Sequence, residues 1–206
     1  MSEIDFRPTR LVSGGQTGVD RGALIAAALQ GFDHGGYCPL NRRAEDGQIP
    51  PEFPMEESES PDYLVRTRLN VQHSDATLVM TYEDEHRLTG GTRRTVEFCR
   101  AFENPFFVLS LEPGADKGWN LSAAKAVRAW LRFLEPQVLN VAGPRESKAP
   151  GIQNQACEVV LFTLQTKARC LCGRETPAWV WERAEKAAQP VRCSQCGHTS
   201  YRSDFE

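Results

Sequence analysis

The sequence predicts an α/β fold in which an open, doubly wound parallel sheet is followed by a small appendage stabilised by metal. Three observations support this prediction. Short apolar runs of strand length alternate with longer segments of helical periodicity. Glycine-rich loops follow three of the apolar runs. Four of the seven cysteines form two close pairs near the C-terminus, a pattern typical of metal binding.

The first element is an apolar run at residues 11–12, which enters a glycine-rich corner and leaves it as a helix. We expect Asp20 to be the N-cap of this helix and Gly31 to end it, because short polar residues cap free N–H groups and glycine accepts left-handed backbone. The proline-rich passage at 50–61 is expected to be a long irregular loop. The other elements of this half are expected to be a strand at 34–39, a charged loop at 42–47 and a helix from 60–62 to about residue 74.

The second half repeats the alternation of strand, glycine corner and helix. The apolar run at 75–82 has polar flanks, which favours a buried strand. The double glycine at 90–91 is expected to form a loop before the next helix. The expected elements are strands at 75–82, 106–111 and 138–142, with helices from the double glycine to about 103, at 119–134 and at 149–167. We therefore expect the first domain to comprise residues 1–167.

Three glycine corners come directly after predicted strands, at residues 14–15, 90–91 and 143. The carboxyl ends of parallel strands meet at one edge of a sheet, and ligands bind there. Free N–H groups at a helix N-terminus attract anions. The corners therefore predict an anion site, although tight packing of the turns would also explain the glycines.

Charged side chains are frequent in the same loops. Arginines suit phosphate because their planar guanidinium group donates two parallel hydrogen bonds. Carboxylates repel phosphate, so these are expected to contact ring N–H groups or to orient an arginine. The predicted ligand has an anionic end and a polar heterocycle or sugar, which fits a nucleotide or a phosphorylated pterin. The residues expected to bind it are Gly14, Gly15, Gln16, Thr17, Gly18, Asp20, Arg21, Arg43, Glu45, Asp46, Thr89, Gly90, Gly91, Thr92, Asn140, Gly143, Pro144, Arg145 and Glu146.

The character of the chain changes at Cys170, and residues 168–206 form the expected second domain. Cys170 and Cys172, with Cys193 and Cys196, would place four thiolates around a structural Zn²⁺ ion. The segment resembles a zinc ribbon, although its first pair is C-x-C where ribbons have C-x-x-C. His198 could then replace one cysteine. A ribbon could also dock on a protein or a nucleic acid.

Composition excludes some functions. The formal net charge of −3 argues against general nucleic-acid binding. No apolar run is long enough to span a membrane, and the first residues lack the features of a signal peptide. We expect a cytoplasmic protein without membrane contact that forms a homo-oligomer.

Four stretches carry a resemblance to the putative molybdenum carrier family: SGGQTGVDRGA at 13–23, RAEDGQIP at 43–50, LTGGT at 88–92 and LNVAGPRES at 139–147. The matches run in order over about residues 10–165. The resemblance implies a Rossmann-like fold, of the superfamily that includes the lonely-guy phosphoribohydrolases. It also implies molybdenum cofactor, a molybdopterin with a terminal phosphate, as the ligand. The protein would then be a carrier or a sensor.

An enzymatic alternative comes from the same superfamily. Its phosphoribohydrolases have P-G-G-x-G-T-x-x-E, in which the glutamate helps to cleave nucleoside monophosphates. Here the stretch is TGGTRRTVE at 89–97, so Glu97 survives and is expected to face the cleft. Thr89 and Arg94 depart from the motif, which argues against hydrolysis.

Overall fold

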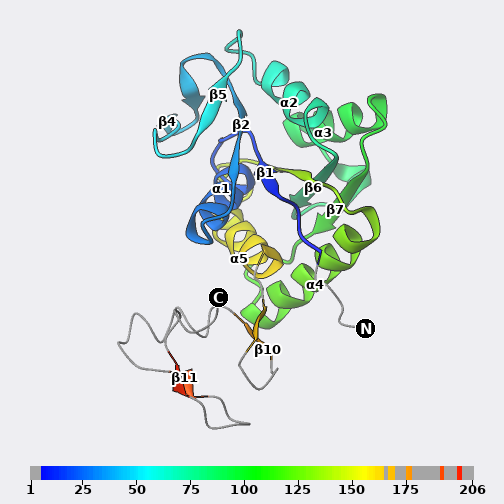
Figure 1. The fold of residues 1–206 in the computed structure, drawn as a ribbon. Helices are drawn as coiled ribbons and strands as arrows, with labels where there is room; N and C mark the ends of the chain where they lie inside the picture. Colours follow the sequence, from blue (N-terminus) through cyan, green and yellow to red (C-terminus); the bar gives the residue numbers. More distant parts are fainter. Residues whose placement is uncertain (1–5, 165–166, 170–174, 178–190, 193–198, 201–206) are drawn as a thin grey trace. The chain divides into compact units, whose positions relative to one another are not determined.

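The computed structural model describes residues 6–164 and, beyond them, the short strands 167–169, 175–177, 191–192 and 199–200 (Figure 1). The chain divides into two compact units, Met1–Leu164 and Gln165–Glu206. In the second unit, β9 (Lys167–Arg169) pairs antiparallel with β10 (Glu175–Pro177), and β11 (Val191–Arg192) with β12 (Thr199–Ser200).

The first unit is built on a six-stranded sheet whose strands are all parallel. The strand order β5-β2-β1-β8-β6-β7 reverses direction across β1 and β8, as in doubly wound sheets. The α/β, Rossmann-like prediction for this unit is therefore confirmed. The strands are β1 (Arg10–Val12), β2 (His34–Cys38), β5 (Met55–Glu57), β6 (Ala76–Thr81), β7 (Phe106–Ser110) and β8 (Val138–Ala142).

Helices cover the sheet in two groups (Figure 1). The first group packs α1 against α5 and α5 against α4, and the second packs α2 against α3. Gly22 of α1 allows its close approach to α5, because a Cβ there would lie 2.3 Å from the backbone oxygen of Gln153. The helices are α1 (Val19–Leu29), α2 (Tyr63–Gln72), α3 (Gly90–Ala101), α4 (Lys117–Leu134) and α5 (Ile152–Leu164). No helix in the described ranges has the length and apolar character needed to cross a bilayer.

The core lies between the sheet and these helices. Leu11, Leu78 and Leu139 come from three neighbouring strands and are almost fully buried, and Ile152 of α5 packs in the same cluster. Burial of such side chains supplies the main favourable term in folding, at about 1.5–3 kcal/mol for each.

The N-terminus of α1 differs from the prediction. Gly18 is the N-cap and makes no side-chain cap bond, whereas Asp20 lies inside the helix and is buried. Gly31 does follow the helix with a φ of +59°, as expected for a helix stop.

Four other features differ from the prediction. Gly90 and Gly91 form the first turn of α3 instead of a loop before it. The last long helix runs from Ile152 to Leu164, so it is shorter at both ends than the expected 149–167. The irregular passage contains the edge strand β5, and the charged loop contains the hairpin of β3 (Arg43–Ala44) and β4 (Gly47–Gln48).

Candidate functional site

A cavity of about 390 Å³ lies beyond the carboxyl ends of β6 and β8. The residues after both strands line it, together with the first turn of α3, the first half of α2 and part of the β1–α1 loop. This is the edge of a parallel sheet where ligands bind. The volume is typical of small-molecule sites.

The N-terminus of α3 opens into this cavity. Its N-cap, Thr89, makes no side-chain cap bond. Gly90 and Gly91 both line the cavity, and a Cβ on either would meet no atom within 4 Å. Gly90 has a φ of +54°, which favours glycine. The first turn of the helix, with the positive end of the helix dipole, therefore lies at the cavity.

The inner wall of the cavity contains a buried ion pair. Arg66 of α2 places Nη1 3.1 Å from Oδ2 of Asp20, and the two side chains are 12% and 3% exposed. Gly14 makes room for this contact, because a Cβ there would overlap Nη1 of Arg66. Burial raises the pKa of Asp20, and the attraction of the Arg66 guanidinium opposes that shift.

Sequence analysis missed Arg66 because an arginine in a polar helix usually lies at the surface. No local pattern marks this position, and it is the structure that shows its neighbours Thr67 and Asn70 to be buried. Tyr63, Tyr82 and Lys148 also line the cavity without having been predicted.

The N-terminus of α1 is closed by protein groups. Val19 N donates to Pro144 O at 3.2 Å, and Gly18 N donates to Gln153 Oε1 at 3.2 Å. A Cβ on Gly18 would lie 2.4 Å from Pro144 O. Gly15 has a φ of +74° and packs against Ile49. Tight packing thus explains Gly15 and Gly18, and of the two helix N-termini it is that of α3 that opens into the cavity.

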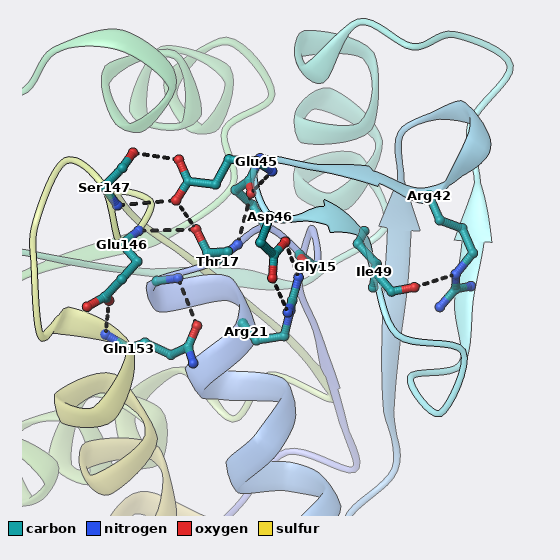
Figure 2. Close-up of polar contacts among 12 residues, drawn as sticks. Gly15, Thr17, Arg21, Arg42, Glu45, Asp46, Ile49, Glu146, Ser147 and Gln153 are labelled. Carbon is teal, nitrogen blue, oxygen red and sulfur yellow. Dashed lines mark hydrogen bonds and ion pairs between the residues drawn. The ribbon is translucent and has the colours of Figure 1, made fainter.

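Glu45 connects the β1–α1 loop to the loop after β8 (Figure 2). Its carboxylate accepts hydrogen bonds from the Thr17 hydroxyl and from Ser147, whose Oγ lies at 2.5 Å and whose N lies at 3.2 Å. Arg145 Nε lies 3.5 Å from Oε2. Burial alone would raise the pKa of Glu45, but the bonds from Ser147 and Thr17 and the nearby Arg145 lower it.

Other charged residues of these loops also hold the structure together (Figure 2). Arg21 donates from Nη1 and Nη2 to Asp46 at 3.1 and 3.3 Å, and from Nε to Gly15 O at 3.2 Å. Glu146 accepts from Gly151 N at 2.5 Å and from Gln153 N at 3.0 Å, just before and within the first turn of α5. None of these three charged side chains lines the cavity.

Two further predicted residues lie outside the cavity. Arg43 stacks its guanidinium 4.9 Å above the Tyr63 ring and donates to the Tyr63 hydroxyl at 3.2 Å. Arg43 therefore contacts Tyr63, which lines the cavity, and does not line the cavity itself. Asn140 is buried in β8 and donates to Thr77 Oγ1 at 3.3 Å. Its role is to join β8 to β6.

Glu97 does not face the cavity, contrary to the prediction. It pairs with Arg93 at 2.9 Å and with Arg94 at 2.7 Å on the exposed side of α3. It lines a different hollow, shared with Glu85 and Arg100. Hydrogen bonds from Arg94 and then Arg93 lower its pKa. In this structure Glu97 therefore lines the second hollow and not the main cavity.

The structure thus separates the predicted residues into two sets. Those that do not line the cavity are Gly14, Gly15, Thr17, Gly18, Arg21, Arg43, Glu45, Asp46, Asn140, Glu146 and, as the hydrolase candidate, Glu97. Those that it brings together around the cavity are Gln16, Asp20, Thr89, Gly90, Gly91, Thr92, Gly143, Pro144 and Arg145.

The predicted zinc ligands Cys170, Cys172, Cys193 and Cys196, with the alternative ligand His198, lie outside the described residues. Within the described ranges, no group of three His, Cys, Asp or Glu side chains is placed to hold a metal ion.

Comparisons with known proteins agree with this architecture. Residues 11–164 match the model of the circularly permutated YpsA SLOG family. A search of curated proteins gives no match. Among solved structures, the chain is similar to the "Putative molybdenum carrier protein" of Syntrophus aciditrophicus SB, with 33% identity and a TM-score of 0.71 over 77% of this chain and 96% of that one. The chain belongs to the circularly permutated YpsA SLOG family.

Proposed function

We propose that the protein binds a phosphorylated small molecule in the cavity at the N-terminus of α3, and that it acts as a carrier or sensor of this ligand. The observation that carries the proposal is the open first turn of α3. Thr89 leaves it without a side-chain cap, and a Cβ on Gly90 or Gly91 would have no contact within 4 Å. Backbone N–H groups in that arrangement suit a phosphate.

The cations around the cavity support the same ligand class. Arg145 and Lys148 line the cavity, and Arg145 is 45% exposed at the side chain. Tyr63 and Tyr82 provide aromatic surface on the remaining wall. A ligand with a phosphate at one end and a ring at the other would match both kinds of surface.

Within this class we infer that molybdenum cofactor is the ligand, with a nucleotide as the second candidate. The inference draws on the name of the structural relative in Syntrophus aciditrophicus SB and on the two kinds of surface in the cavity. A carrier role needs no catalytic group. It is also consistent with the position of Glu97, which is turned away from the cavity.

Native mass spectrometry of anaerobically purified protein tests which ligand is retained. A bound mass that dissociates as a pterin phosphate, with or without molybdenum, is expected. A retained nucleotide would identify the second candidate. Protein that retains neither, and binds neither when they are added in excess, would contradict the proposal.

Gly91→Asp tests where the phosphate binds. The new carboxylate would extend into open space and would repel a phosphate there, whereas an acidic residue in the first turn of a helix stabilises folding. We expect the affinity for a phosphorylated ligand to fall about tenfold or more, equivalent to about 1.4 kcal/mol, with a melting temperature no lower than that of the wild type. Gly91→Asn is the control, because it has the same size without the charge. Equal affinities for the two variants would place the phosphate elsewhere.

A further inference from the structure

The loop after β8 folds around the carboxylate of Glu45 (Figure 2). Ser147 donates to it from Oγ at 2.5 Å and from N at 3.2 Å, and Arg145 Nε lies 3.5 Å from Oε2. The Thr17 hydroxyl donates to the same carboxylate from the β1–α1 loop. The Glu45 side chain is only 18% exposed. The carboxylate is therefore held in place from two separate loops.

Arg145 uses only part of its guanidinium group in this contact. The group carries five N–H donors, one on Nε and four on the two Nη atoms. Arg145 makes its ion pair with Glu45 from Nε, and neither Nη atom donates a hydrogen bond to any described residue. The side chain lines the cavity and is 45% exposed. Two Nη atoms in one plane suit the two oxygens of a phosphate or carboxylate.

We propose that Arg145 binds an anionic group of the ligand through Nη1 and Nη2, and that Glu45 is the positioning residue that holds the guanidinium at Nε. Glu45 then has a role in binding although it does not line the cavity. The pair is too exposed to add much to stability, so its contribution is the orientation of Arg145. The inference rests on the proposed function, because it takes the ligand of the main cavity to be anionic.

Modification of the full-length protein with phenylglyoxal tests the role of Arg145. This reagent reacts with accessible guanidinium groups, and peptide mass spectrometry reports each arginine separately. Inorganic phosphate is the probe, with chloride at equal ionic strength as the reference. We expect phosphate to slow the modification of Arg145 severalfold and to leave unchanged that of Arg68, an exposed arginine that does not line the cavity. An Arg145 that phosphate does not protect would overturn the inference.

Glu45→Gln tests the positioning role. Without its ion pair, Arg145 should need a severalfold higher phosphate concentration for half protection. Loss of a negative charge would act in the opposite direction, because it reduces repulsion of the anion. Asp46→Asn is the matched control, since Asp46 pairs with Arg21 and its loss removes the neighbouring charge but not the contact between Glu45 and Arg145. Unchanged protection in Glu45→Gln, or an equal effect of the two variants, would contradict the role of Glu45.

Circular dichroism checks that each variant is folded. Glu45→Asp provides a second measurement if Glu45→Gln does not fold. It keeps the charge but shortens the side chain by one methylene group, so it should also weaken the protection of Arg145. Full protection of Arg145 in Glu45→Asp would contradict the positioning role.

The result is separable from the test of the proposed function. If phosphate protected Arg145 while Gly91→Asp and Gly91→Asn bound a phosphorylated ligand equally well, the anion site at Arg145 would stand and the site at α3 would fail. If Arg145 were not protected while Gly91→Asp alone weakened binding, the site at α3 would stand and the inference about Arg145 and Glu45 would fail.

Discussion

Single residues show how the chemistry of one side chain depends on its partners. Glu45 and Glu97 belong to loops or turns that were expected to face the ligand, yet their carboxylates are engaged elsewhere. Glu45 accepts from Thr17 and Ser147, and Glu97 accepts from Arg93 and Arg94. A carboxylate that is already satisfied in this way holds neighbouring segments in place.

The lowered pKa of Glu45 predicts a loss of stability in acid. The folded protein holds this carboxyl below its usual pKa of 4.5, so its contribution is fully present above that value and is lost as the pH falls through the folded-state pKa. Glu45→Gln should therefore lower the free energy of unfolding by about 1–2 kcal/mol at pH 7, and the difference from wild type should shrink below pH 4.5.

Urea unfolding at a series of pH values measures this difference. Glu59→Gln is the control, because Glu59 is exposed and should show almost no change at any pH. A Glu45→Gln difference that stayed constant down to the lowest pH would contradict the assignment.

Gly14 should not tolerate a side chain. A Cβ there would overlap Nη1 of Arg66 and would lie 2.8 Å from Asp20 Oδ2, so Gly14→Ala is expected to lower stability by about 1–3 kcal/mol. Gly91→Ala is the matched control, since its Cβ would meet open space. Thermal melting of the two variants checks the comparison, and equal melting temperatures would show that Arg66 can move aside without cost.

Single elements show why similar sequence patterns gave different outcomes. The β1–α1 corner and the start of α3 both contain a double glycine. In the first, the α1 N-terminus is occupied by Pro144 O and Gln153 Oε1. In the second, the α3 N-terminus has no side-chain cap and opens into the cavity. The α1 N-terminus is thus closed by Pro144 and Gln153, two residues that are distant from it in the sequence.

Strands and helices with strong patterns were predicted close to their observed bounds. β6 is buried at every position, and α2 begins after Asp62, which accepts a hydrogen bond from Leu64 N at 2.9 Å. β5 was missed because three residues in a proline-rich passage have no pattern of their own. It becomes a strand by pairing with β2.

The close contact between α1 and α5 predicts that a side chain at Gly22 of α1 will lower the stability of the protein. A Cβ on Gly22 would lie 2.3 Å from Gln153 O. Because this atom belongs to the backbone, Gly22→Ala should cost at least about 1–3 kcal/mol despite the better helix propensity of alanine. Gly118→Ala in the exposed first turn of α4 should be neutral or stabilising. Chemical denaturation of both variants is the measurement, and a stable Gly22→Ala would mean that the two helices are not tightly packed.

At the scale of the whole molecule, the zinc site remains a prediction from the cysteine pattern. We expect one zinc ion for each chain, held by Cys170, Cys172, Cys193 and Cys196, because a short segment gains much of its folding free energy from metal. Elemental analysis of purified protein checks the stoichiometry. Cys193→Ser should abolish zinc retention, and Cys38→Ser, at a buried free cysteine of the first unit, should not. Protein without zinc would contradict the prediction.

The sequence by itself determined the alternation of strands and helices, the parallel sheet, and the edge at which the cavity lies. These features follow from local apolar periods and from the rule that parallel strands end at one edge. Only the tertiary structure decided which helix N-terminus is open, which arginine reaches the cavity, and that Glu97 points away from it. Each of those outcomes depends on contacts between segments distant in sequence, such as Gly18 with Gln153 and Asp20 with Arg66, and no local pattern encodes such contacts.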